Sequence, residues 1–255
     1  GCLVGAMSSG YFSDRFGRKL PLITAAALFT IAAIGTGAVN SFTPFIIYRL
    51  IGGLGIGLAS AISPMYIAEI SPADMRGRLV SINQLTIVIG ILAAQIINYL
   101  IAEPVPAGAT DEFIVQSWNG QVGWRWMFWA GTVPALLFFV FSFFIPESPR
   151  FLAKSGNWKQ ANATLERIGG TQYALQEQKE IAETLHGTDS KIDWKALGSK
   201  KVRPVLILGI VLAVFQQWCG INVIFNYAEE VFTSAGYSVG DMLFNIVITG
   251  TVNLI

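Results

Sequence analysis

Long apolar stretches alternate with short polar segments along the whole chain. A helix needs about 20 apolar residues to cross a hydrocarbon core about 30 Å thick. Stretches of this kind lie at 20–39, 45–69, 79–101, 126–145 and 204–227, and two shorter ones lie at 1–12 and 242–255. The pattern predicts membrane-spanning helices throughout, and the cut-short stretches at both ends, without a starting Met, indicate an excerpt of a longer protein.

The composition agrees with this interpretation. Hydrophobic residues make up 53% of the 255 positions and charged residues only 13%, and the mean hydropathy is +0.54. A soluble domain would carry about 25% charged residues. We therefore interpret the chain as a multi-pass membrane protein, with the lipid bilayer as its surroundings.

The basic residues are concentrated in alternate loops. Three segments, 13–19, 70–78 and 146–203, hold 15 of the 17 Lys and Arg. Basic residues in short loops favour the cytoplasmic side of a membrane. We therefore predict that these three segments face the cytoplasm, in a plasma membrane or a bacterial inner membrane.

Several features that could suggest other functions have simpler explanations. The run GGLGIG at 52–57 lacks the preceding strand and the acidic residue of a dinucleotide loop, so we interpret it as a close contact between membrane helices. Cys2 and Cys219 lie in apolar stretches and have no metal or disulfide spacing. No span combines a His, a Cys and an acid as catalysis requires. We expect no catalytic residue, metal, cofactor or nucleic-acid partner.

Three charged clusters lie on the predicted cytoplasmic side. They are GYFSDRFGRK at 10–19, YIAEISPADMRGRL at 66–79 and IPESPRFL at 145–152. Each offers an acid and an arginine within a few residues. Three such clusters on one membrane face can form a salt-bridge network whose making and breaking follows a movement of the helices.

Six motifs follow one another along the chain. They are G-x-x-x-D-R-x-G-R-K at 10–19, R-x-x-G-G-x-G-x-G from Arg49, P-x-Y-I-A-E-x-x-P-x-x-x-R-G from Pro64, G-W-R from Gly123, P-E-S-P-R from Pro146 and Q-Q-x-x-G-I-N from Gln216. The first resembles the hallmark loop of the major facilitator superfamily, and the six together resemble its sugar porter family. The chain is most similar to bacterial xylose/proton symporters. The resemblance implies an all-α fold of twelve helices in two halves, with this excerpt running from within helix two into helix eight.

The last long apolar stretch carries four uncharged polar residues: Gln216, Gln217, Asn222 and Asn226. In a straight helix they would spread over an arc of about 220°, so one face cannot present all of them. A helix broken near Gly220 could, because transporters build midplane sites from discontinuous helices. A carboxamide offers a sugar hydroxyl both a donor and an acceptor, without the desolvation cost of a charge. Hydrogen bonding between helices is the alternative role.

The resemblance also implies which residues bind the sugar. The family's ligands map onto Gln84, Gln216, Gln217, Asn222 and Asn253, and we expect Asn226 to join them. Asn226 stands where the family usually has the first residue of a Tyr-Tyr pair, and Ile91 stands where related xylose carriers have a second glutamine. Both departures leave the sugar open, either a pentose or a hexose.

Arg49 is the candidate for energy coupling. A charge within a membrane span is costly and usually functional. In proton-coupled relatives the corresponding arginine pairs with an acid of helix one, which precedes this excerpt. The resemblance therefore favours proton symport, while facilitated diffusion and sodium coupling stay open.

The resulting hypothesis is a sugar carrier that works by alternating access, with a non-transporting sugar sensor of the same fold as the alternative. A cytoplasmic network is expected to hold that side shut in the outward-facing state; its predicted members are Asp14, Arg15, Arg18, Glu69, Arg76, Glu147 and Arg150. We predict three parts of the chain. Residues 1–145 hold helices two (partial) to six, 146–203 form a cytoplasmic linker with its own helices, and 204–255 begin the second half.

Overall fold

The computed structural model describes residues 1–104, 111–186, 199, 202–220, 223, 227, 230–231, 234–236 and 239–254. Within these ranges the chain is helical and forms no strand. The helices are α1 Cys2–Phe16, α2 Lys19–Ala38, α3 Phe42–Ile70, α4 Arg76–Ile101, α5 Asp111–Gln116, the π-helix η1 Asn119–Gly123, α6 Trp124–Ala130, α7 Thr132–Ser142, α8 Pro149–Lys154, α9 Trp158–His186, α10 Arg203–Trp218 and α13 Val239–Leu254.

Among the described residues, four helical segments are long and apolar enough to cross a membrane. They are α2, α3, α4 and the stretch Asn119–Ser142, which is built from η1, α6 and α7. They match the first four predicted spans, so the expectation of an all-α membrane protein is confirmed. The fourth span starts earlier than predicted and is interrupted at Gly131, where α6 ends and α7 begins. Pro134 explains the interruption, because its ring lacks an N–H and would clash with the carbonyl of Ala130 in a continuous helix.

The described part of the predicted fifth span begins with helix α10. Helix α10 has 16 residues and ends at Trp218, and Gly220 then adopts a φ of 76°. At 1.5 Å per residue such a helix is about 24 Å long, less than the roughly 30 Å of a hydrocarbon core. The helix therefore ends at the position where the sequence predicted a break.

Helices α1, α2 and α3 pack closely through small residues. Gly53 lies against Gly1, and a Cβ atom at Gly57 would collide with the carbonyl oxygen of Cys2. On the other side of α3, a Cβ at Gly55 would come within 3.1 Å of the carbonyl oxygen of Ala25. The interpretation of the GGLGIG run as a close contact between membrane helices is therefore confirmed.

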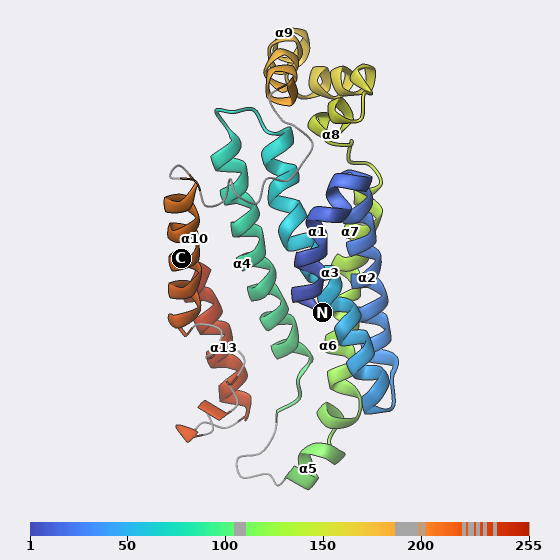
Figure 1. Cartoon of the computed structure of the whole chain (residues 1–255). Helices are drawn as coiled ribbons and strands as arrows, with labels where there is room; N and C mark the ends of the chain where they lie inside the picture. The colour runs from blue at the N-terminus through green and yellow to red at the C-terminus, as the bar shows by residue number, and fades with distance from the viewer. Residues whose placement is uncertain are drawn as a thin grey trace.

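The opposite ends of the bundle differ in character. The α1–α2 turn, the α3–α4 turn and helices α8 and α9 lie together at one end (Figure 1). They contain described basic residues of all three basic segments, as a single cytoplasmic face requires, while Arg203 of the third segment begins α10. At the other end, Arg125 of α6 donates to the carbonyl of Gly37 at 3.0 Å and to the side chain of Asn40 at 2.8 Å, which fixes α6 against the end of α2.

Helices α8 and α9 form a packed unit of their own. Their shared core includes Leu152, Ala161, Leu165, Ala174 and Ile181. At Gly170 the backbone of α9 leaves the helical region, with φ 81° and ψ 177°, a conformation that is open only to glycine. These helices lie in the predicted cytoplasmic linker, whose residues 187–198 and 200–201 fall outside the described part of the chain.

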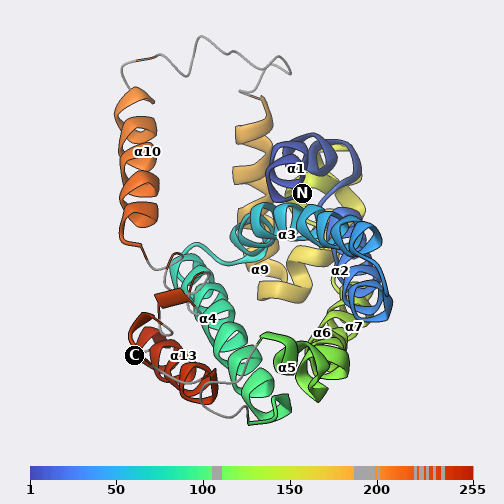
Figure 2. The same ribbon diagram turned by 90° about the horizontal axis from the view of Figure 1, so that it is seen from below.

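Helices α4, α10 and α13 lie on the other side of the molecule from α1 and α2 (Figure 2). α13 packs along α4, with the rings of Tyr99 and Phe244 6.2 Å apart. A Cβ at Gly250 of α13 would collide with the side-chain oxygen of Gln95 on α4. This contact lies between the two parts of the chain that the predicted linker at 146–203 separates.

Candidate functional site

The best-defined polar cluster lies at the predicted cytoplasmic end and centres on Arg18 and Glu69. Arg18 precedes α2, and Glu69 lies in the last turn of α3. The Arg18 Nη2 atom lies 2.7 Å from Oε1 of Glu69, and the two side chains are only 10% and 11% exposed. The other terminal nitrogen, Nη1, donates to the carbonyl of Ser13 at 2.9 Å. A buried charge-assisted pair of this kind fixes the α1–α2 turn to the end of α3.

The Glu147 carboxylate accepts hydrogen bonds from backbone N–H groups at the start of α2. It does not pair with the side chain of a described arginine. Its carboxylate accepts from the backbone N–H of Arg18 at 2.8 Å and of Lys19 at 3.3 Å, and from its neighbour Ser148 at 2.8 Å. A helix N-terminus favours a negative group both through its unpaired N–H groups and through its dipole. Gly17, with φ 84°, makes the approach possible, because a Cβ there would collide with the Glu147 carboxylate.

Two further residues complete the cluster. Ser148 is fully buried and donates from Oγ to Oε2 of Glu69 at 2.5 Å. Tyr66, one turn before Glu69, donates from its hydroxyl to the carbonyl of Pro146 at 2.8 Å. Neither residue was predicted from the sequence, although both lie inside the charged motifs. We call Arg18, Glu69, Glu147 and Ser148 the cytoplasmic clamp.

The other predicted members of the cytoplasmic network lie outside this clamp. Asp14 pairs with Lys154 at 3.4 Å, with both side chains more than half exposed. Arg15 donates to the hydroxyl of Tyr11 at 2.6 Å. Arg76 and Arg150 are exposed and form no ion pair with any described residue.

Arg76 lies close enough to α9 to act on Tyr173. Burial raises the pKa of the Tyr173 hydroxyl, the negative charge of Glu177 adds to the rise, and the positive charge of Arg76 opposes it. Arg76 therefore interacts electrostatically with the Tyr173 hydroxyl. The role of Arg76 in a gate stays a prediction.

The predicted sugar ligands are only partly described. Gln84 is exposed on α4, and Gln216 and Gln217 are exposed in the last turn of α10, just before the helix ends. Asn253 belongs to α13, and Asn222 and Asn226 lie outside the described residues. The predicted ligands within the described residues therefore belong to α4, α10 and α13, which lie on one side of the molecule (Figure 2).

Gln95 is a polar residue of α4 that the sequence analysis missed. It follows Gln84 by eleven positions and Ile91 by four, so all three lie on one face of the helix. Its side-chain oxygen is buried and has no hydrogen-bond partner among the described residues. The signal in the sequence was a second carboxamide at helical spacing from Gln84 within an apolar span.

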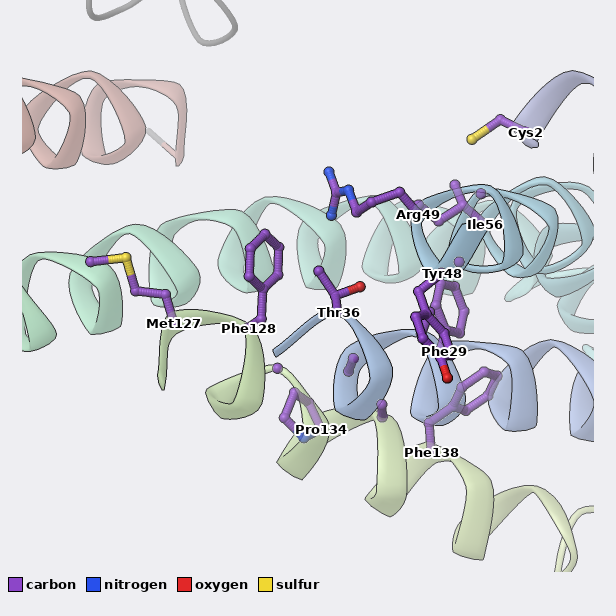
Figure 3. Close-up of a pocket in the computed structure, with 16 residues that line it drawn as sticks. Cys2, Phe29, Thr36, Tyr48, Arg49, Ile56, Met127, Phe128, Pro134 and Phe138 are labelled. Carbon is purple, nitrogen blue, oxygen red and sulfur yellow. The ribbon is translucent and has the colours of Figure 1, made fainter. Parts of the chain in front are cut away.

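Arg49 faces a cavity of about 570 Å³ that is lined by residues of α1, α2, α3, α6 and α7. Its guanidinium lies over the ring of Phe128, 5.4 Å from the ring centre, and Figure 3 shows the side chain beside this ring. Thr36 and Tyr48 also line the cavity, but none of its described lining residues is acidic. A cation–π contact offsets only part of the cost of a charge within a membrane span.

Comparison with known proteins gives one consistent family. The family model described as sugar (and other) transporter matches residues 1–255. The chain is 40% identical to the D-xylose-proton symporter of Escherichia coli strain K12 over 275 residues, which covers 100% of the chain and 53% of the relative. It is 39% identical to the arabinose-proton symporter of Bacillus subtilis strain 168, with the same coverage. The chain therefore spans about half the length of these relatives.

Solved structures agree with the sequence comparisons. The proton:xylose symporter of the major facilitator superfamily bound to 6-bromo-6-deoxy-D-glucose matches with a TM-score of 0.83 and 39% identity, over 99% of this chain and 55% of that one. A partially occluded inward-open structure of the Escherichia coli xylose transporter matches with a TM-score of 0.79, 39% identity and coverage of 99% and 57%. These relatives are multi-pass membrane transporters and not enzymes. The chain belongs to the sugar transporter family and has the major facilitator fold.

Proposed function

We propose that the protein of which this chain is part carries a monosaccharide, a pentose or a hexose, across the cell membrane together with a proton. The observation that carries the proposal is the match of the whole chain to the sugar transporter family. Its relatives include symporters that are named for xylose and for arabinose. Transport by alternating access would use the two halves that the chain partly contains.

The sugar would bind where α4 faces the broken end of α10. Gln216 and Gln217 lie in the last turn before Gly220, and Gln84 is exposed on α4. Carboxamides pair with hydroxyls as donors and as acceptors. Asn222, Asn226 and Asn253 would complete the ligand set, and Ile91 would make one edge of the site apolar.

The cytoplasmic clamp would serve as the fixed part of the gate. It joins the α1–α2 turn, the end of α3 and the start of α8 through buried bonds. Arg76 and Arg150, which form no ion pair with a described residue, would supply the changing part by pairing with acids of the second half when the cytoplasmic side closes. Ion pairs that exist in one state only bias the equilibrium between the two states.

Arg49 would couple the sugar to the proton. It is a charged group in an otherwise largely apolar cavity, and it would be stabilised by an acid from a segment that precedes this chain. Protonation of that acid would remove the partner of Arg49. This gives the proton a direct effect on the conformation of the carrier.

Uptake by the full-length protein in proteoliposomes tests the proposal. Labelled xylose, arabinose and glucose should accumulate inside the vesicles, above their external concentration, when the outside is made more acidic than the inside. A protonophore should abolish this accumulation. Equilibration without accumulation would indicate facilitated diffusion, and accumulation driven by sodium alone would replace the proton. Binding without flux would indicate a sensor. Neither binding nor flux of any monosaccharide would contradict the proposal.

A further inference from the structure

We propose that Gln95 destabilises the contact between α4 and α13 and thereby keeps this contact reversible. The side-chain oxygen of Gln95 is buried in the contact and has no hydrogen-bond partner among the described residues. The inference rests on the proposed function, in which the two parts of the chain move relative to each other. It gives a conformational role to a residue outside the predicted set of sugar ligands.

Gly250 of α13 lies directly on the amide group of Gln95. A Cβ atom added at Gly250 would collide with the Oε1 atom of Gln95 and would lie 3.1 Å from its Cδ atom. Gly250 is buried, whereas none of the residues of α4 is fully buried. The packing of α13 along α4 (Figure 2) therefore covers the oxygen of Gln95.

The neighbourhood of this oxygen is apolar. The Cδ1 atom of Leu92 would lie 3.3 Å from the same added Cβ at Gly250, and one turn further along α4 the rings of Tyr99 and Phe244 are 6.2 Å apart. No described N–H or O–H group bonds to the oxygen. The Cα hydrogens of Gly250 offer only the weak type of bond that carbon donors form.

An unpaired acceptor of this kind makes the closed contact less stable. Folded proteins pair nearly all of their buried polar groups, because an unpaired one loses its bonds to water without replacement. The loss corresponds to a factor of about 5 to 150 in an equilibrium constant. It disappears when α13 moves away from α4 and water reaches the oxygen. Compared with an apolar side chain of similar volume, Gln95 therefore favours the separated helices.

This effect suits a contact that must form and break. The Tyr99–Phe244 ring contact and the close approach at Gly250 hold α13 against α4. A carrier that alternates between conformations needs more than one of them to be populated. Gly250 makes room for the carboxamide of Gln95, and the carboxamide lowers the stability of the contact that encloses it. Together they allow close packing that is not permanent.

Pulsed EPR on the full-length protein, in a background without native cysteines, tests this role. Spin labels at Glu103, two residues after α4, and at Ala235, four residues before α13, report the separation of the two helices; both positions are exposed. Gln95→Leu should raise the ratio of short to long distances about fivefold or more. It should also raise the melting temperature and slow sugar uptake. Gln95→Met repeats the test with an unbranched side chain.

Two further variants control for unspecific effects. Gln160→Leu makes the same chemical change at an exposed position of α9 and should leave the distances unchanged. Gly250→Ala places a Cβ where the Gln95 oxygen lies and should shift the distances in the opposite direction, towards longer values.

Two results would overturn the inference. One is an unchanged distance distribution in both Gln95 variants. The other is a lowered melting temperature or a shift to longer distances in both, which would show that a donor pairs with Gln95 in the full carrier. Sugar binding by the parent is measured on the same samples. Its absence would contradict the proposed function, whereas the distance test of Gln95 would keep its meaning.

Discussion

Arg18 and Glu69 form a buried ion pair with a separation of 2.7 Å between Nη2 and Oε1, although 51 positions separate them in the sequence. The pair connects the turn before α2 with the last turn of α3, and Ser148 adds the start of α8 by bonding the second oxygen of Glu69. The three charged motifs therefore meet in one cluster, while their exposed arginines remain outside it. This separation distinguishes a fixed structural clamp from candidate moving contacts.

Glu69→Gln should destabilise the protein, because it leaves the buried Arg18 without its counter-charge. Removal of one partner of a buried ion pair costs about 3 kcal/mol. We expect a clearly lowered melting temperature of the purified full-length protein. Asp14→Asn is the matched control: its pair with Lys154 is exposed, so the loss should stay below about 1 kcal/mol. Equal shifts for the two variants would show that the Arg18–Glu69 pair is not a special anchor.

Gly17→Ala should be more harmful than Gly156→Ala, although both glycines have nearly the same φ, 84° and 82°. A Cβ at Gly17 would collide with the Glu147 carboxylate, whereas a Cβ at Gly156 meets nothing within 4 Å. The backbone cost at Gly17, with ψ −169°, is about 1–3 kcal/mol because this region is open almost only to glycine, and Gly17→Ala also disturbs the bonds of Glu147 to the start of α2. Thermal unfolding of both variants measures the difference. A larger loss for Gly156→Ala would contradict this role of Glu147.

The membrane orientation can be tested with single cysteines in a background where Cys2 and Cys219 are replaced by serine. A cysteine at Gln121, in η1, should react with an impermeant reagent added to the outside of right-side-out vesicles. A cysteine at Lys159, in α9, should react only after the membrane is permeabilised. The expectation rests on the basic segments, which favour the cytoplasmic side. The opposite accessibility would reverse the orientation and remove the cytoplasmic assignment of the clamp.

Gly250→Ala should slow transport while retaining sugar binding. A Cβ at this position would collide with the Gln95 side chain and keep α13 from packing on α4, which changes the balance between conformations. Gly90→Ala on α4 is the control, because a Cβ there meets no atom within 4 Å. That change should be neutral or stabilise the helix by up to about 1 kcal/mol. Equal uptake rates for the two variants would indicate that the α4–α13 contact does not limit transport.

The membrane spans could be predicted because hydropathy acts over about 20 residues and needs no tertiary information. The end of α10 near Gly220 also followed from local features, namely four carboxamides that no single helix face could present. The clamp was only partly predictable. Ser148 meets Glu69 across 79 positions and Tyr66 meets Pro146 across 80, and such contacts depend on how the helices approach each other. The backbone bonds of Glu147 could not be read from the sequence, because charge patterns indicate acid–base pairs and not carboxylates at a helix start.

The most direct test of the central claim is the affinity of Gln217→Ala for sugar. If Gln217, in the last turn of α10, bonds a sugar hydroxyl away from water, the change leaves that hydroxyl unpaired at a cost of roughly 1 to 3 kcal/mol. This corresponds to a loss of affinity of about 5- to 150-fold. Gln160→Ala, on α9 and away from the proposed sugar site, is the control and should bind like the parent.

The measurement is calorimetry of several pentoses and hexoses with purified, monodisperse full-length protein. The account predicts the weakened binding for every sugar that the parent binds, with the fold retained. A role of Gln217 in helix packing would instead lower stability by around 0.6 kcal/mol and leave the affinity of the folded protein nearly unchanged. Unchanged affinity for all of these sugars would contradict the assignment of the broken end of α10 as the sugar site.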